Sequence, residues 1–210
     1  MIILAAGLSL FSILILVERK VKFPTIDLNL FKIRAFAAGN VTSFLNTLAF
    51  NCVPFLISLF LQLVMGYDPT FAEVVLLPMP LIVLVMSLIS WRLSDKFGSR
   101  GISSMGLAVN IASLLWLSTL NQNSSYYFIL ISLVIFGLGC GLFSSPNIGS
   151  VMDSVLASRG GVATGVRSAL FQTGAVLSIP LAMIFMSTVI PYDKLTTLVS
   201  SSQLASSESF

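Results

Sequence analysis

The sequence predicts an all-α integral membrane protein with about six transmembrane helices. Its 210 residues are 56% hydrophobic and only 9% charged, whereas about 25% of the residues in a soluble domain are charged. Six mostly apolar runs each approach the ~20 residues that cross the hydrocarbon core of a bilayer as a helix. No run shows the alternating pattern of a membrane-spanning strand. We therefore expect lipid to be the main solvent of this chain.

The six apolar runs follow one another with mostly short connectors. The runs cover residues 1–17, 41–65, 71–90, 102–120, 126–152 and 164–190. Turn-forming and charged residues gather between them, at 66–69, 95–101, 121–125 and 158–161. The expected segments are a transmembrane helix at 1–17, a cytoplasmic connector at 18–40, a five-helix domain at 41–190 and a truncated external polar loop at 191–210.

The basic residues of the connectors predict the orientation in the membrane. They fall in alternate connectors, which contain Arg19, Lys20, Lys22, Lys32 and Arg34, then Arg92, Lys96 and Arg100, and finally Arg159. Cytoplasmic loops carry the excess of Lys and Arg in membrane proteins. We therefore expect a multi-pass protein of the cell membrane whose loops 18–40, 91–101 and 153–163 are cytoplasmic, with the intervening loops outside.

The composition excludes most catalytic sites. The chain has no histidine, and its two cysteines, Cys52 and Cys140, both lie within apolar runs. Neither a zinc site nor a histidine-based nucleophilic set can be built from such residues. The formal net charge of +3 and the absence of a long basic run also argue against a nucleic-acid partner. We expect no enzyme activity, no metal and no cofactor.

Polar residues form a stripe along the second apolar run. At about 100° per residue, the five side chains fall within about 60° of one another on the helix surface. They are Asn40, Thr47, Asn51, Ser58 and Gln62. The stripe has two interpretations: hydrogen bonds that hold neighbouring helices together, or one wall of a water-filled substrate path. In the last run, Gln172 lies deep enough to reach a ligand, whereas Arg167 is close enough to the end to extend to the cytoplasmic interface.

Small residues recur every four positions in the last two runs. They are Gly137, Gly141, Ser145 and Gly149 in one run, and Gly174 and Ser178 in the other. Such spacing lets the backbone of another helix approach closely. The prolines of the same runs, together with those at positions 54, 78 and 80, favour a protein that changes conformation over an inert anchor.

One connector resembles a known family signature. Residues 91–100 read WRLSDKFGSR, which is similar to the cytoplasmic signature of the major facilitator superfamily. Asp95, Lys96, Gly98 and Arg100 match that signature. Three further stretches are similar to the family's drug:proton antiporters with fourteen helices: 18–36, the run GLGCG at 137–141 with Pro146 and Asn147, and 159–174.

The resemblance implies a fold and a function. The chain would contain the last linker helix and most of the C-terminal lobe of such a transporter, and would export amphipathic small molecules or drugs by proton antiport with alternating access. Its partners would be the lipid bilayer, a small-molecule substrate and the missing N-terminal lobe of the same transporter. The alternative is a non-transporting membrane module that assembles with another subunit through the small-residue helix faces.

The signature loop has a physical interpretation of its own. The Asp95 carboxylate can pair with Arg92, Lys96 or Arg100, and such charge-assisted bonds are about twice as strong as neutral ones. If they form in only one access state, they shift the equilibrium between the states. The alternative is a solvated loop that only fixes the topology. The chain shows no acidic residue at mid-depth in a run, so we expect the proton-coupling carboxylate to lie outside it.

Overall fold

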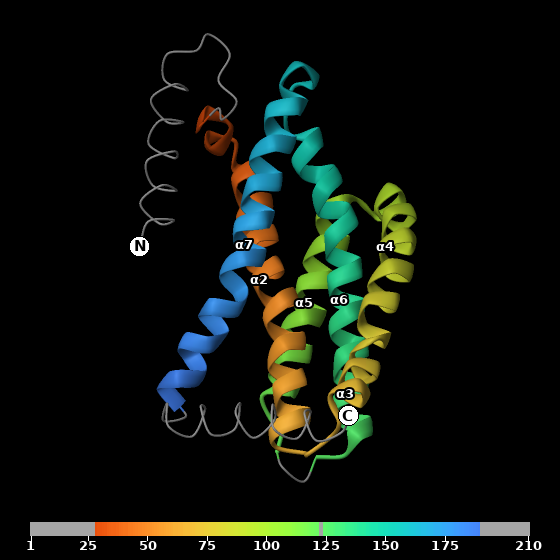
Figure 1. Cartoon of the computed structure of the whole chain (residues 1–210). Coiled ribbons are helices and arrows are strands. Elements are labelled where there is room, and N and C mark those ends of the chain that lie inside the picture. The colour runs from red at the N-terminus through yellow and green to blue at the C-terminus, as the bar shows by residue number, and fades with distance from the viewer. Residues whose placement is uncertain (1–27, 122–123, 190–210) are drawn as a thin grey trace, which may run out of the picture.

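The computed structural model describes residues 28–121 and 124–189 (Figure 1). Their elements, in order, are η1 (Leu28–Lys32), α2 (Arg34–Leu63), α3 (Pro69–Leu76), α4 (Pro78–Phe97), α5 (Ser99–Leu117), α6 (Tyr126–Asp153), η2 (Ala157–Arg159) and α7 (Gly160–Val189). The expected helix at 1–17 and the expected external loop at 191–210 lie outside the described residues. So does the part of the first connector that precedes residue 28.

Five of the predicted membrane spans are present as long helical segments. By length and composition, 5 segments are apolar enough to cross a membrane: Arg34–Leu63, Pro69–Phe97, Ser99–Leu117, Tyr126–Asp153 and Ala157–Met186. Within these spans only α6 has about half of its residues buried by the rest of the chain. The prediction of an all-α integral membrane protein is confirmed.

The second span begins earlier than the sequence predicted. Helix α2 starts at Arg34, inside the segment 18–40 that was expected to be a connector. Alanines and Phe36 continue the helical pattern there, and Phe36 is fully buried, so packing stabilises the extra turns. The C-terminal end of α2 is followed by Gly66, which has a positive φ of 69°. This conformation allows Tyr67 N to donate to Leu61 O at 3.0 Å.

The run expected as one helix at 71–90 is two helices. The break falls at Leu77, because Pro78 has no N–H with which to continue the helical hydrogen bonds. Leu77 itself keeps helical backbone angles, with φ of −55° and ψ of −38°, and its N–H donates to Val74 O at 3.3 Å. The first piece, α3, is capped by Asp68, whose Oδ2 accepts from Thr70 N at 2.9 Å. The second piece, α4, extends to Phe97, beyond the predicted end.

The connector expected at 91–101 is almost entirely helical. Helix α4 ends at Phe97 and α5 begins at Ser99, which leaves Gly98 alone between them. Its φ of 84° is a backbone conformation that glycine adopts without steric cost. Gly98 N also donates to Ser94 O at 2.9 Å. A single residue therefore reverses the chain where the charges had indicated a loop.

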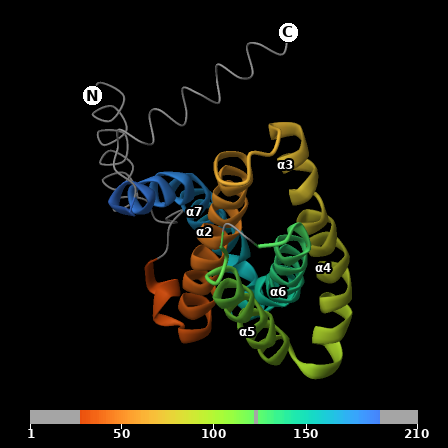
Figure 2. The same ribbon diagram turned by 90° about the horizontal axis from the view of Figure 1, so that it is seen from below.

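Helix α6 is the centre of the bundle. Seen from below, α6 lies among α2, α4 and α5, while α7 packs on the other side of α2 (Figure 2). One apolar cluster joins α2, α3, α4 and α6 and includes Leu61, Val75, Met79, Leu133 and Phe136. A second cluster joins η1, α2, α6 and α7 and includes Leu30, Phe36, Val151, Ala163 and Val166. The two clusters hold the helices as one body.

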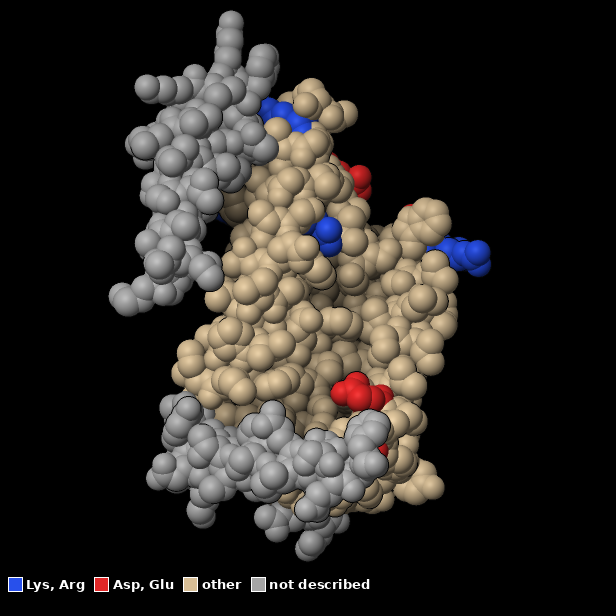
Figure 3. Space-filling model, viewed as in Figure 1, with Lys and Arg blue, Asp and Glu red and all other residues tan. Residues whose placement is uncertain are grey.

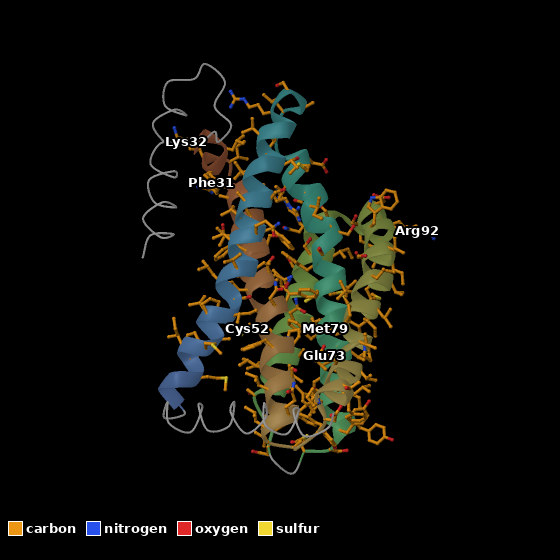
Figure 4. The ribbon with its side chains drawn as sticks, in the orientation of Figure 1. Phe31, Lys32, Cys52, Glu73, Met79 and Arg92 are labelled. Carbon is orange, nitrogen blue, oxygen red and sulfur yellow. The ribbon has the colours of Figure 1, made fainter. Side chains whose placement is uncertain are left out.

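Charges are sparse between the two ends of the bundle. Figure 3 shows Lys and Arg mainly at the upper end and along the upper half, and a hollow that runs between the part formed by α2 and α7 and the part formed by α4. Lys32 and Arg92 mark the upper end, whereas Glu73 on α3 lies in the lower half (Figure 4). The connectors that the sequence identified as basic therefore lie, as far as they are described, toward the same end of the bundle.

Candidate functional site

The five stripe residues lie on one side of α2, and they become more accessible along the helix. Asn40 and Thr47 are buried, whereas Asn51, Ser58 and Gln62 are half-buried. Helix α7 crosses α2 and diverges from it toward the lower end (Figure 1). The lower half of the stripe therefore has less cover than the upper half.

The stripe residues form hydrogen bonds within α2 itself. Asn40 Nδ2 donates to Phe36 O at 2.9 Å, and Thr47 Oγ1 donates to Ser43 O at 2.8 Å. Asn51 Nδ2 donates to Thr47 O at 2.9 Å, and Gln62 Nε2 donates to Ser58 Oγ at 2.9 Å. Each bond joins residues four positions apart. These donors are therefore satisfied without bonding to a neighbouring helix.

Other polar residues connect the helices, and the sequence analysis did not single them out. Asn110 Nδ2 on α5 donates to Asn46 Oδ1 on α2 at 2.9 Å. The Cys140 thiol on α6 lies 3.6 Å from Asn110 Oδ1 and 3.8 Å from Asn46 Oδ1. Asn110 is almost fully buried. A lone asparagine in the middle of an apolar run was the signal that could have found this cluster.

Three further bonds fasten α6 to its neighbours. Ser90 Oγ on α4 donates to Gly141 O at 3.0 Å. Ser113 Oγ on α5 donates to Ser132 O at 2.8 Å. Asn147 Nδ2 on α6 donates to Gly39 O on α2 at 3.1 Å. Side-chain hydrogen bonds to a neighbour's backbone are a common means of holding helices together in lipid.

Neighbouring helices approach α6 most closely at the glycines in its middle. A Cβ at Gly137 would lie 2.9 Å from Met79 O, and one at Gly141 would lie 2.6 Å from Met86 Cβ, so both face α4. Gly139 faces Asn110 on α5. A Cβ at Gly149, by contrast, would have no described atom within 4 Å. Close packing therefore does not extend along the whole predicted ridge.

The small residues of α7 lie toward α2. A Cβ at Gly174 would be 3.2 Å from Phe44 O. Ser178 is buried, and its hydroxyl donates to Ala175 O at 2.7 Å. Ser145 on α6 is half-buried. Helix α7 thus packs on α2 through small residues, while its opposite side, which carries Gln172, is exposed.

The signature residues lie together at the turn between α4 and α5. Arg92, Asp95, Lys96, Gly98 and Arg100 are all exposed. Within the described residues, Asp95 forms no ion pair with the three basic side chains. The pairing that the sequence suggested is therefore absent in this conformation, and the carboxylate stays accessible to solvent or to another part of the protein.

Arg167 has both a buried and an accessible part. The residue is half-buried, and its Nε is fully buried without a hydrogen-bond partner among the described residues. A side chain of this kind can bury its stem while its charged end extends toward the interface, so the predicted extension of Arg167 stays a prediction. Asn40 Oδ1 on α2 is the matching case of a buried acceptor without a partner.

The fold and these contacts define a multi-pass membrane protein whose polar groups lie inside a helical bundle. Within the described residues, no group of three His, Cys, Asp or Glu side chains could hold a metal ion. The chain belongs to the Major Facilitator Superfamily, whose family model matches residues 1–191. It is therefore a member of a family of secondary transporters, not of enzymes.

Several curated proteins are similar to this chain. It is 36% identical over 150 residues to the riboflavin transporter RibZ of Clostridioides difficile, covering 70% of this chain and 33% of that protein. It is 27% identical over 154 residues to the multidrug efflux pump LfrA of Mycolicibacterium smegmatis, covering 73% and 31%. The quinolone resistance protein NorB of Staphylococcus aureus is 27% identical over 183 residues, covering 86% and 39%. The chain spans about a third of the length of these relatives.

Proposed function

We propose that this chain forms most of the C-terminal lobe of a transporter that exports amphipathic small molecules by proton antiport. The observation that carries the proposal is the polar stripe of α2. Its donors are bonded within their own helix, while other residues connect the helices. The half-buried lower part of this polar surface, at Asn51, Ser58 and Gln62, is accessible to a substrate in this conformation, whereas Asn40 and Thr47 are buried. Asn40, Thr47, Asn51, Ser58 and Gln62 are the proposed path residues on α2. Gln172, on the exposed side of α7 that faces away from α2, is proposed as a separate path residue.

The alternating-access part of the proposal concerns the turn at Gly98. Asp95 is exposed beside Arg92, Lys96 and Arg100 without an ion pair among the described residues. A carboxylate that is unpaired in this conformation can gain partners in another, and the difference in free energy shifts the populations of the two states. The loops 18–40, 91–101 and 153–163 are proposed to be cytoplasmic. The coupling carboxylate is proposed to lie in the other lobe.

The alternative of a non-transporting assembly module has less support. It requires the small-residue faces of α6 and α7 to be free for another subunit. Gly137 and Gly141 already face α4, and Gly174 already faces Phe44 on α2. These three positions are occupied within the chain itself, whereas Gly149 is open, so most of the small-residue positions are not free for another subunit.

A chimera tests the proposed function. The matching segment of the riboflavin transporter RibZ would be replaced by this chain, reconstituted in vesicles and given a pH gradient. We expect saturable, gradient-driven movement of riboflavin or of a lipophilic cation dye by the chimera, and none by this chain alone. A chimera that inserts and folds but moves neither compound would overturn the proposal. Gradient-driven dye movement by the chain alone would contradict the placement of the coupling group in the other lobe.

A further inference from the structure

One carboxylate lies at the end of the bundle opposite the basic connectors and has no described cation near it. Glu73 on α3 is exposed, and it forms no hydrogen bond or ion pair with another described residue. Lys and Arg gather at the upper end and along the upper half (Figure 3). The described residues of the lower half include Asp68 and Glu73 but no Lys or Arg. Asp68 already accepts from Thr70 N at 2.9 Å, which leaves Glu73 as the carboxylate without a partner.

Glu73 borders the hollow between the part formed by α2 and α7 and the part formed by α4. Figure 3 shows an acidic side chain in the lower part of this hollow, and Figure 4, in the same orientation, labels Glu73 at that place. Its neighbours Ala72 and Val75 are fully buried, so α3 packs through another side of the helix. A molecule in the hollow can therefore reach the carboxylate without any movement of the helices.

Packing places Glu73 at the level of the lower part of the α2 stripe. The buried α3 residues on either side of it share one apolar cluster with Ile57 and Leu61 of α2. Ser58 and Gln62 directly follow these two residues in the chain, and both are half-buried. Gln62 Nε2 donates to Ser58 Oγ at 2.9 Å, so the amide oxygen of Gln62 remains available as an acceptor. The lower stripe and Glu73 therefore lie at the same end of the bundle.

The position of Glu73 within a membrane span gives the carboxylate a functional meaning. The span Pro69–Phe97 begins four residues before it, which is about 6 Å along a helix axis. A charged side chain in contact with lipid is costly, and those found within spans face cavities and mark the paths of substrates or ions. Because no described residue of this end carries a positive charge, the lower hollow has a negative potential that attracts cations.

We propose that Glu73 selects the charge of the substrate by binding the cationic group of an organic cation at the lower end of the hollow. The carboxylate pairs with an ammonium or phosphonium centre, and Ser58 and Gln62 offer uncharged oxygen atoms at the same level. An anion of similar shape is repelled, which adds to the selectivity. The inference rests on the proposed function, because it names the substrate class of that transporter. In that function the lower end is external, so Glu73 is a contact on the side where the cation is released.

Charged thiol reagents test the potential in the hollow. In a background without Cys52 and Cys140, Ser58→Cys in lipid nanodiscs would react with two methanethiosulfonates, one carrying trimethylammonium and one carrying sulfonate. Each rate is divided by the rate of the same reagent with 2-mercaptoethanol. We expect the cationic reagent to be favoured at least about threefold, and Glu73→Gln to remove this preference. Equal normalised rates with Glu73 present, or no reaction at Ser58→Cys, would overturn the proposal.

Protection by an organic cation tests the binding itself. Tetraphenylphosphonium and the neutral triphenylphosphine oxide, which is similar in shape, would be titrated against the reaction of Ser58→Cys with N-ethylmaleimide. We expect the cation to protect at a concentration at least about tenfold lower than the neutral compound, because only the cation pairs with the carboxylate. Glu73→Gln should abolish that difference. Equal protection by the two compounds, or no protection by the cation, would overturn the proposal.

Two further variants assign the recognition to Glu73. Glu73→Asp keeps the charge and should retain a preference for the cation. Asp68→Asn removes the other carboxylate of this end but keeps an oxygen that can cap Thr70 N, so it should leave the protection unchanged. Helical content shows that each variant is folded. An equal loss of preference in Asp68→Asn and Glu73→Gln, or a wild-type preference in Glu73→Gln, would overturn the assignment to Glu73.

The two proposals fail in different ways. Transport by the RibZ chimera, without a preference for the cation in the protection experiment, would overturn the role of Glu73 alone. A preference for the cation in the isolated chain, with an inactive chimera, would overturn the transport function and leave a cation-binding site.

Discussion

Asn110 on α5 donates a 2.9 Å hydrogen bond to Asn46 on α2, and this bond joins two helices that otherwise pack mainly on other helices, α5 on α6 and α2 on α7 (Figure 2). Gly139 on α6 makes room for it, because a Cβ there would overlap the Asn110 side chain. The Cys140 thiol completes the cluster. Polar side chains inside the bundle thus connect three helices.

Removing this bond should lower stability. We expect Asn110→Leu and Asn46→Leu each to destabilise the chain, and their coupling to be about 0.6 kcal/mol and at most about 2 kcal/mol, as measured for interhelical bonds in lipid. A double-mutant cycle of unfolding in detergent measures the coupling. Ser118→Ala, at an exposed site, is the control. Additive effects of the two leucine variants would show that the bond contributes nothing.

Glycine packing between α5 and α6 gives a second prediction. A Cβ at Gly106 would lie 2.6 Å from Phe143 N and 2.8 Å from Gly139 O, and both are backbone atoms that cannot rotate away. Gly106→Ala should therefore destabilise the bundle by about 1–3 kcal/mol, as overpacking does. Gly149→Ala is the matched control, because open space surrounds it and alanine is the better helix former by up to about 1 kcal/mol. Equal effects in unfolding experiments would contradict the close approach.

The turn between α4 and α5 gives a third prediction. Gly98 has φ of 84°, so Gly98→Ala should cost about 1–2 kcal/mol of stability through backbone strain alone. Gly101, three residues later in α5, has no positive φ and no described atom within 4 Å of a Cβ. Gly101→Ala should be neutral or stabilising in the same unfolding measurement. A neutral Gly98→Ala would show that the turn adopts another conformation.

The orientation in the membrane can be tested by labelling. In a background without Cys52 and Cys140, single cysteines at Ser99 and Ser158 should react with an impermeant reagent only from the cytoplasmic side, and those at Asp68 and Ser124 only from outside. The reason is the excess of Lys and Arg in cytoplasmic loops. Labelling of Ser99 from outside would reverse the proposed topology.

Accessibility along α2 can be tested in the same background. Cysteines at Asn51 and Ser58, which are half-buried, should react with small hydrophilic thiol reagents, whereas one at Ile57, which is 7% exposed on the packed side, should not. Thr47 is 4% exposed, so reaction there requires a second conformation in which the helices packed around it separate. Equal reactivity at Ile57 and Ser58 would remove the support for a polar path.

The sequence by itself determined the class of protein and most of the spans. Long apolar runs with few charges specify membrane helices, because the backbone must satisfy its own hydrogen bonds in lipid. The span at 126–152 was predicted to within one residue of its end at Asp153. Helix ends were less predictable from the charge pattern. The start of α2 extends into the expected connector because Phe36 is buried, and α4 continues to Phe97 because the chain turns at a single glycine, Gly98.

Only the tertiary structure decided which polar residues meet. Asn46, Asn110 and Cys140 come from three different runs, and nothing in their spacing brings them together. The stripe of α2 was visible from helical periodicity, but its bonds within its own helix were not. Arg167 shows the same limit: its position near a helix end predicts a side chain that extends toward the interface, but it does not predict that the Nε is buried. Periodicity defines a face of one helix, and contact between faces depends on how all the helices pack.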